Sequence, residues 1–263
     1  MCFVRANGGV IHFADEGPAG GRTVVFSNSL GTDFRIWDEV AKPFAETTRV
    51  IRYDNRGHGL SELRAGPAAI ADFASDLAAL LDSRGVGEAT IVGLSIGGMI
   101  AQELYRLRPD LVRSLVLCDT AHQIGTTESW TSRIDAVNKG GLETIADGVM
   151  RPWFTRDYHE NCADAVAGWR AMLTRTPQAG YLAACAALRD ADLTSGAKAI
   201  RAPTLCVVGD QDTSTPVALA REFTELIPAA KLEIVAGAAH LPCIEKPAIL
   251  RALIEAHLKK VSP

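Results

Sequence analysis

Short apolar runs alternate along the chain with longer segments in which apolar residues recur every three or four positions. The short runs are typical of strands and the longer segments of amphipathic helices. The predicted strands are 9–13, 23–26, 49–53, 89–92, 114–118, 204–208 and 231–235. The predicted helices are 70–84, 99–108, 217–226 and 248–258. Several runs are apolar almost throughout, as in strands buried on both faces, so the alternation predicts a doubly wound α/β sheet.

Two local signals refine this pattern. Asn7-Gly8 separates two short apolar runs and predicts a hairpin at the start of the chain. In the helix 70–84 the apolar residues share one face, and Asp72, Asp76 and Asp82 are expected elsewhere on it. Gly85 follows where a left-handed cap residue is common.

The alternation stops between about 121 and 200, where helical patterns continue without convincing strands. We interpret this stretch as a helical cap over the carboxyl-terminal edge of the sheet. The predicted domains are therefore a core formed by 1–121 and 200–263, and a cap formed by 122–199.

The strongest chemical motif is Gly93-Leu94-Ser95-Ile96-Gly97, which follows the strand 89–92 and precedes a helix. This is the GxSxG pattern in strand–turn–helix context, known as a nucleophile elbow. The serine must sit on a sharp, strained turn, and the glycines two positions away let the strand and helix backbones approach closely. Ser95 is therefore the candidate nucleophile.

A serine hydroxyl needs a base to take its proton, and in this architecture the order along the chain is serine, acid, histidine. His240 fits because it lies in the loop after the strand 231–235. The other histidines precede any plausible acid, lie in the cap or lie in the last helix: His12, His58, His122, His159 and His257. For the acid, the loop 209–213 offers Asp210 and Asp212, and spacing alone does not decide between them. Asp212 is favoured because it is further out along the loop and can turn back toward an imidazole.

An oxyanion hole needs backbone N–H donors. One is expected from Ile96 and the other from the loop 27–31, where Leu30 is the best candidate by position. The glycine-rich loop 53–61 does not follow a phosphate-binding pattern. We interpret it as a loop held by a hydrogen-bond network between Asp54 and Arg56.

Composition narrows the class of protein. Of the 263 residues, 48% are apolar and 22% are charged, which excludes a disordered or fibrous chain. The net charge of −4 without a basic block argues against nucleic acid as a partner, and no apolar run is long enough to span a membrane. The six cysteines show no CxxC spacing, so free thiols in the cytoplasm are expected. No pattern implies a metal, and the oligomeric state is left open.

With these motifs the chain resembles the α/β-hydrolase fold family from end to end. Within that family it is similar to the 3-oxoadipate enol-lactonases of aromatic catabolism. The resembling segments are 27–32, 53–59, 93–99, 130–134 and 180–193. Asn28-Ser29 stands where many members of the wider family have His-Gly, which fits the lactonase subgroup.

The resemblance implies a mostly parallel, eight-stranded sheet with the cap inserted after the sixth strand. It also implies cofactor-free hydrolysis by Ser95, Asp212 and His240, through an acyl-enzyme. The implied substrate, 3-oxoadipate enol-lactone, is a small lactone with a free carboxylate, for which an arginine fork is well suited. Of the six arginines between 122 and 199, Arg133 is favoured because it lies three residues from Trp130. Trp130 and Trp153 are expected to wall the lactone ring.

Other hydrolases on the same scaffold stay open, namely a carboxylesterase, a carbon–carbon bond hydrolase or a perhydrolase. Epoxide hydrolases and dehalogenases carry aspartate at the elbow, and dienelactone hydrolases carry cysteine, so Ser95 argues against these three. A non-catalytic ligand receptor is also disfavoured, because Ser95, Asp212 and His240 are all present.

Overall fold

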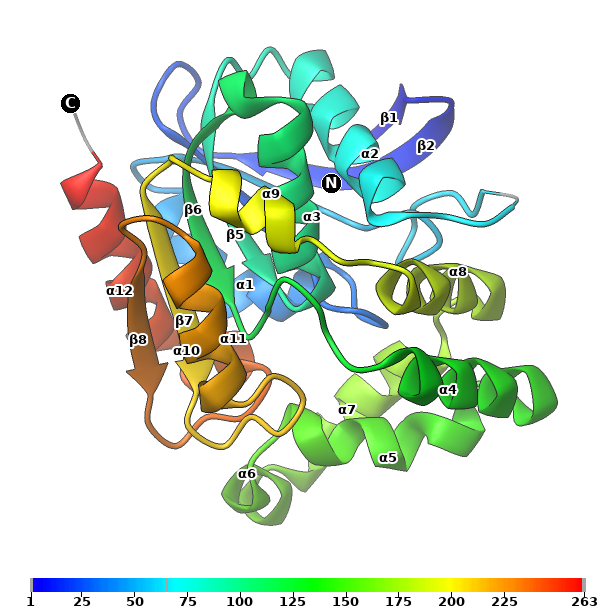
Figure 1. The fold of residues 1–263 in the computed structure, drawn as a ribbon. Helices are drawn as coiled ribbons and strands as arrows, with labels where there is room; N and C mark the ends of the chain where they lie inside the picture. Colours follow the sequence, from blue (N-terminus) through cyan, green and yellow to red (C-terminus); the bar gives the residue numbers. More distant parts are fainter. Residues whose placement is uncertain (1, 65, 262–263) are drawn as a thin grey trace.

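The structure is a computed structural model that describes residues 2–64 and 66–261. Its centre is an eight-stranded sheet of order β1-β2-β4-β3-β5-β6-β7-β8 (Figure 1). The strands are β1 Cys2–Ala6, β2 Gly9–Glu16, β3 Thr23–Ser27, β4 Arg49–Tyr53, β5 Ala89–Leu94, β6 Val112–Cys118, β7 Thr204–Gly209 and β8 Lys231–Val235. β2 runs antiparallel to β1 and β4, and the other neighbours are parallel. The predicted fold class is therefore confirmed.

The chain begins with the predicted hairpin. β1 pairs with β2 from Cys2↔Phe13 to Ala6↔Gly9. The turn residues Asn7 and Gly8 have φ of 47° and 78°, the left-handed conformation that a tight hairpin requires. β2 continues beyond the predicted end at residue 13, because its second half pairs with β4 as far as Glu16↔Val50.

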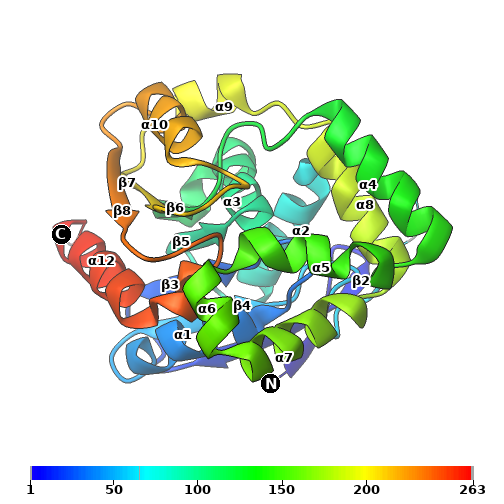
Figure 2. The same ribbon diagram turned by 90° about the horizontal axis from the view of Figure 1, so that it is seen from below.

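Helices cover both faces of the sheet. α1 and α12 lie on one face, and α3, α9 and α10 lie on the other (Figure 2). The core helices are α1 Asp38–Phe44, α2 Ile70–Ser83, α3 Ile96–Leu107, α9 Thr194–Ala199, α10 Val217–Leu226, α11 Pro242–Glu245 and α12 Pro247–Lys260, with short 3-10 turns at Phe34–Trp37 and Pro109–Leu111. α3 starts three residues before the predicted position, directly after Ser95. Its first turn contains Gly97 and Gly98, and their close packing outweighs the poor helix propensity of glycine.

Asp76 of α2 is buried rather than solvated, contrary to the expectation from helical periodicity. Its side chain is only 5% exposed. Arg56 Nε lies 2.7 Å from one carboxylate oxygen, and Arg64 Nη2 lies 3.0 Å from the other. Periodicity within one helix did not reveal these partners, because both arginines come from a loop more than ten residues away.

The predicted pairing of Asp54 with Arg56 is wrong for the same reason. Arg56 points to α2, where it binds Asp76 and donates to the carbonyl of Asp72. Asp54 instead accepts hydrogen bonds from His12 Nδ1 at 2.7 Å and from the backbone N–H groups of residues 34 and 60. The loop is thus held from β2 and from its own backbone.

Five helices form a cap between β6 and β7, on the side toward which the parallel strands point (Figure 1). They are α4 Thr127–Gly140, α5 Glu143–Trp153, α6 Arg156–Asn161, α7 Ala163–Thr174 and α8 Gln178–Arg189. α9 falls inside the predicted cap range 122–199 but contacts α3 and α10 of the core. No helix within the described ranges is long and apolar enough to cross a membrane, and the cytoplasmic location stays a prediction.

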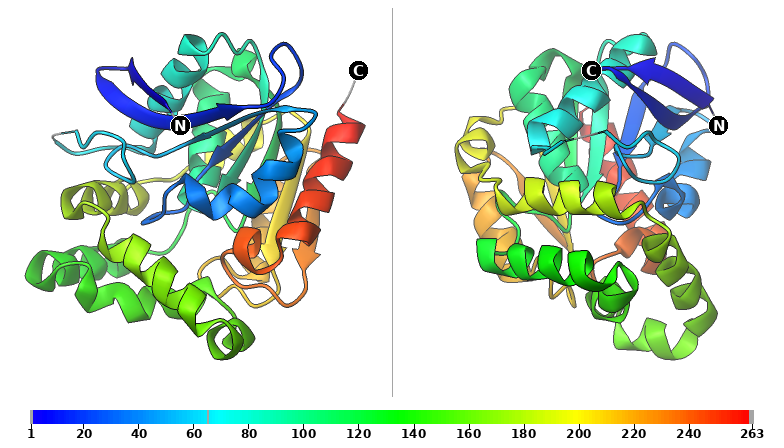
Figure 3. Two further views of the ribbon diagram at one scale, coloured as in Figure 1. Left: turned by 180° about the vertical axis from the view of Figure 1, so that it is seen from behind. Right: turned by 90° about the vertical axis from the view of Figure 1, so that its right-hand side faces the viewer.

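The cap rests on the loop after β4 through a contact between two glycines. α8 lies directly below that part of the core (Figure 3). A Cβ added to Gly180 would stand 2.1 Å from the carbonyl oxygen of Gly57, and one added to Gly57 would stand 2.6 Å from the Cα of Gly180. Neither position can accept a side chain unless α8 moves away from the core.

We therefore expect Gly180→Ala to destabilise the protein by about 1–3 kcal/mol, the usual cost of overpacking. Gly168→Ala is the control, because a Cβ at Gly168 of α7 meets nothing within 4 Å. That change should stabilise its helix by up to about 1 kcal/mol. Urea unfolding measures both, and equal effects from the two variants would contradict a close cap–core contact.

Candidate active site

Ser95 sits on a strained turn between β5 and α3. Its φ is 56° and ψ is −119°, a conformation that is rare for a residue with a side chain. The turn is held by its backbone, since Ser95 N–H donates to the carbonyl of Cys118 at 3.0 Å and its carbonyl accepts from Thr120 Oγ1 at 2.7 Å. The side chain is 6% exposed and lines a pocket. The sequence pattern had predicted this arrangement.

Three glycines make the turn possible. A Cβ on Gly93 would lie 2.3 Å from the carbonyl oxygen of Gly97, and one on Gly97 would lie 2.3 Å from the carbonyl oxygen of Ser27. A Cβ on Gly98 would lie 2.5 Å from the methyl group of Thr120. Helix α3 therefore packs against the ends of β3, β5 and β6 with no room for side chains.

Two backbone N–H groups near Ser95 are open donors. Ile96 is the first residue of α3, and a first-turn amide has no acceptor within its own helix. Leu30 lies in a loop, and none of the hydrogen bonds found in the described part of the chain uses its N–H. Asn28 anchors this loop by donating to the carbonyl of Tyr53 at 2.7 Å and accepting from Trp37 Nε1 at 3.1 Å. These contacts hold the loop on which the second expected oxyanion donor lies.

Asp212 and His240 are hydrogen-bonded. His240 Nδ1 lies 2.9 Å from Asp212 Oδ2. Asp212 also accepts from the N–H groups of Ser214 and Thr215 and from Thr215 Oγ1. Burial favours the neutral carboxyl, but the charge and hydrogen bond of His240 and the hydrogen bonds from Thr215 outweigh it and lower the pKa of Asp212 to about 2. Asp210 is exposed and accepts from the N–H of Gly237, so Asp212 is the partner of the histidine.

The loop that carries His240 is tied to the cap. The N–H of His240 donates to the carbonyl of Pro152, and the N–H of Leu241 donates to the carbonyl of Trp153. Glu245 strengthens the link, because one of its oxygens accepts from Ala239 N–H at 2.7 Å and the other accepts from the N–H and hydroxyl of Thr155. The sequence did not point to Glu245, since its role depends on the cap folding back over the core.

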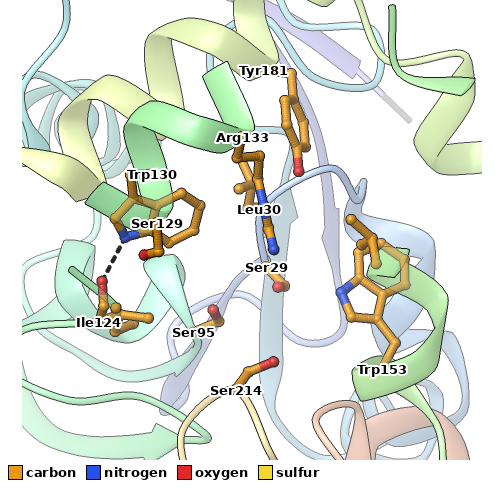
Figure 4. Close-up of a pocket in the computed structure, with 12 residues that line it drawn as sticks. Ser29, Leu30, Ser95, Ile124, Ser129, Trp130, Arg133, Trp153, Tyr181 and Ser214 are labelled. Carbon is orange, nitrogen blue, oxygen red and sulfur yellow. Dashed lines mark hydrogen bonds between the residues drawn. The ribbon is translucent and has the colours of Figure 1, made fainter. Parts of the chain in front are cut away.

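A pocket of about 150 Å³ lies between Ser95 and the cap (Figure 4). A cavity of this size holds a molecule as large as benzene, so the pocket suits a small substrate. Its lining combines core loops with cap helices: Ser29, Leu30, Ser95, Ile124, Gly125, Ser129, Trp130, Arg133, Val149, Trp153, Tyr181 and Ser214. The predicted residues Leu30, Trp130, Arg133 and Trp153 are thus brought together with Ser95. Sequence reasoning did not single out Gly125, Ser129 and Ser214, and it gave no role to Ser29 and Tyr181, although these two lie in segments that carry the family resemblance.

Arg133 is the one cation in this lining. Its guanidinium carbon lies 5.0 Å from the centre of the Trp130 ring, and its head group points toward Ser29 and Ser95 (Figure 4). Trp130 is fixed in turn, because its Nε1 donates to the carbonyl of Ile124 at 2.6 Å. Among the ion pairs of the described residues none involves Arg133, whereas Arg156, Arg170 and Arg189 of the cap all bind carboxylates. Arg133 therefore offers an unpaired positive charge within the pocket.

Two residues of the candidate site, Asp212 and His240, belong to a group of potential metal ligands. Asp119, Asp212 and His240 are all buried, and one oxygen or nitrogen of each lies within 4.8 Å of the others. Two of these side chains already hydrogen-bond to each other, which engages His240 Nδ1 and Asp212 Oδ2. The arrangement therefore fits an acid–base pair with a second carboxyl beside it better than an open coordination site.

Ser95 lies on a strained turn near two open amides and an aspartate–histidine pair. This arrangement is typical of hydrolases that use a serine nucleophile. The alpha/beta hydrolase fold family matches residues 22–247, and the chain belongs to that family.

Individual relatives narrow the comparison. The chain is 33% identical to 3-oxoadipate enol-lactonase 2 of Acinetobacter baylyi, over 95% of this chain and 93% of that protein. The crystal structure of the enol-lactonase from Burkholderia xenovorans LB400 superposes with a TM-score of 0.95 at 32% identity, covering 98% of this chain and 100% of that one. A thermophilic esterase from Thermogutta terrifontis, solved with malate bound, has a TM-score of 0.94 at 27% identity and full coverage of both chains. Lactonases and esterases thus share this fold and this arrangement of elements.

The lowered pKa of Asp212 predicts a pH dependence of stability. The folded value of about 2 lies below the ordinary 3.8, so the contribution is present above pH about 4 and is lost as pH falls toward 2. The difference corresponds to about 2 kcal/mol of unfolding free energy. We expect the wild type to lose that amount relative to Asp212→Asn between pH 5 and pH 2, measured by urea unfolding. Parallel stability curves for the two proteins would contradict the ionised, hydrogen-bonded carboxylate.

Proposed function

We propose that this hydrolase opens a small lactone that carries a free carboxylate, of the 3-oxoadipate enol-lactone type. The observation that carries the proposal is the unpaired guanidinium of Arg133 in a small pocket that also contains Ser95. A partly buried cation without a carboxylate partner is costly unless a ligand supplies the negative charge. A carboxylate accepts two parallel hydrogen bonds from a guanidinium, which would orient the lactone ring relative to the nucleophile.

The proposed reaction proceeds through an acyl-enzyme. Ser95 Oγ attacks the ring carbonyl while His240 Nε2 accepts the hydroxyl proton. The oxygen of the tetrahedral intermediate takes hydrogen bonds from the N–H groups of Leu30 and Ile96. The ring C–O bond then breaks, His240 returns the proton to the enol oxygen, and the enol converts to a ketone in the 3-oxoacyl group that is bound to Ser95.

Water completes the reaction in a second half. His240 takes a proton from the water molecule, whose oxygen attacks the acyl carbon, and returns that proton to Ser95 Oγ as the ester bond breaks. Asp212 stabilises the imidazolium in both halves, since it remains ionised down to a pH of about 2. Trp130 and Trp153 would flank the ring on either side of the serine, from α4 and α5 (Figure 4). The lactonase relatives support this substrate class, and aromatic catabolism is the proposed setting.

A carboxylesterase is the second candidate, supported by the Thermogutta terrifontis esterase and by the same Ser95 arrangement. That esterase was solved with malate, a small carboxylate, which is compatible with an anion subsite in this fold. The two functions share the chemistry at Ser95 and differ in whether the substrate carboxylate is required. Comparing an anionic lactone with a neutral ester therefore distinguishes them.

Ser95→Ala should lower the turnover of both 3-oxoadipate enol-lactone and p-nitrophenyl acetate by at least about 10³-fold, because the nucleophile is removed. A fluorophosphonate probe should label the wild type and fail to label the variant. Intact-protein mass spectrometry detects the label, and progress curves measure the rate of hydrolysis. A labelled or active Ser95→Ala protein would eliminate the proposed nucleophile.

Arg133→Gln should lower kcat/KM for the anionic lactone by about 10–100-fold, the value of a hydrogen bond to a charged group. Hydrolysis of p-nitrophenyl acetate should change little, because that ester has no carboxylate. Arg156→Gln is the matched control, since Arg156 is exposed in the cap and binds Glu160. Equal losses on both substrates, or weak lactone turnover beside strong esterase activity in the wild type, would favour the carboxylesterase.

A further inference from the structure

A second carboxyl group lies behind the acid of the site. Asp119 is the first residue after β6 and has no exposed surface. Its φ of 44° is in the left-handed region, which aspartate and asparagine adopt more readily than most residues. Neither the family comparison nor the proposed mechanism gives this residue a role.

The contacts of Asp119 leave one oxygen without a donor. Its Oδ1 accepts from the N–H of Gly209 at 2.9 Å, and its own N–H donates to the carbonyl of Val207 at 2.8 Å. Its Oδ2 is buried and receives no hydrogen bond from the described residues. One carboxyl oxygen of Asp119 lies within 4.8 Å of one carboxyl oxygen of Asp212.

A proton shared between the two carboxyls would give the unpartnered oxygen of Asp119 a hydrogen bond. Two carboxylates are both acceptors, and in a buried site they cannot both be ionised. Asp212 is the ionised member, because donors surround both of its oxygens and the imidazole of His240 adjoins it. Burial, and then the charge of Asp212, raise the pKa of Asp119 well above its ordinary value.

We propose that Asp119 is protonated in the working enzyme and donates a hydrogen bond from Oδ2 to Asp212, extending the Ser95–His240–Asp212 series by a fourth member. Asp119 is then a positioning residue, since it reaches the reaction only through Asp212. Its donor fixes the orientation of the Asp212 carboxylate from behind. It also lowers the basicity of that carboxylate, so that the proton on His240 Nδ1 stays on the histidine. The proposal rests on the proposed hydrolase mechanism.

The first test is a spectroscopic one that needs no turnover. The carbonyl stretch of a protonated carboxylic acid should be present in the infrared spectrum of the wild type at pH 7 and missing in Asp119→Asn. The difference spectrum cancels any other protonated carboxyl group that both proteins share. The lack of such a band in the difference would overturn the proposal, even if Ser95 proves to be the nucleophile.

The second test uses activity on p-nitrophenyl acetate. Asparagine tolerates the left-handed backbone, accepts from Gly209 and donates to Asp212, so Asp119→Asn should keep kcat/KM within about threefold. Asp119→Gly also tolerates this backbone but has no donor, so Asp212 becomes more basic and holds the imidazolium more tightly. The acid limb of its pH–kcat/KM profile should move to higher pH by about half a unit. A loss in Asp119→Asn as large as that in Asp212→Asn would show that Asp119 acts as a charge, and would overturn the proposal.

Thermal unfolding provides a control on folding and a third readout. The raised pKa means that folding takes up a proton at Asp119, so the wild type loses stability as pH rises above the ordinary aspartate value. Asp119→Asn has no such proton, and its melting temperature relative to the wild type should rise steadily from pH 4 to pH 7. A constant difference would overturn the proposal. If Ser95→Ala keeps full activity, the mechanism fails, while the infrared and thermal results still decide whether Asp119 holds a proton.

Discussion

The active site depends on the close contact between helix α3 and the ends of three strands. A left-handed backbone at a serine costs about 1–3 kcal/mol, and the surrounding packing must supply that energy. Gly93, Gly97 and Gly98 allow the contact, because a side chain at any of them would overlap a neighbouring backbone or Thr120. The same contact decides where α3 begins. Its first amide then directly follows Ser95, so one packing arrangement places the candidate nucleophile and one candidate oxyanion donor.

The charges of the site are separated along one direction. The carboxylate of Asp212 lies behind His240 in the core, and the guanidinium of Arg133 reaches into the pocket from the cap. The anionic substrate proposed above would be attracted to the cap side and repelled from the core side. Trp130 and Trp153 add apolar surface to the same pocket, and less polar surroundings strengthen electrostatic interactions. In the proposed mechanism the cap binds the substrate and the core carries out the chemistry at Ser95.

The sequence predicted most of the elements and the nucleophile elbow. It did not predict contacts that depend on residues far apart in the sequence. The strands were found because buried parallel strands are almost continuously apolar, and the elbow was found because only glycine tolerates such packing. Asp54 was given the wrong partner and the burial of Asp76 was not foreseen, since a buried aspartate and a solvated one look alike in a single helix or loop. Asp119 was also missed, although an acidic residue directly after a buried strand is a signal in itself. The role of Asp119 becomes visible only beside Asp212. That residue is more than ninety positions away in the sequence and lies near Asp119 because β6 and β7 are neighbours.

The order of these elements along the chain has a consequence for synthesis at the ribosome. The nucleophile turn is complete once α3 has emerged, whereas Asp212 and His240 follow only after the whole cap has been made. A growing chain that ends within the cap therefore contains the serine but no base to remove its proton. Under the proposed mechanism, hydrolytic chemistry begins only when β8 and the loop after it have joined the sheet. The proposed nucleophile is then made first in an inert form, and the last part of translation supplies its base.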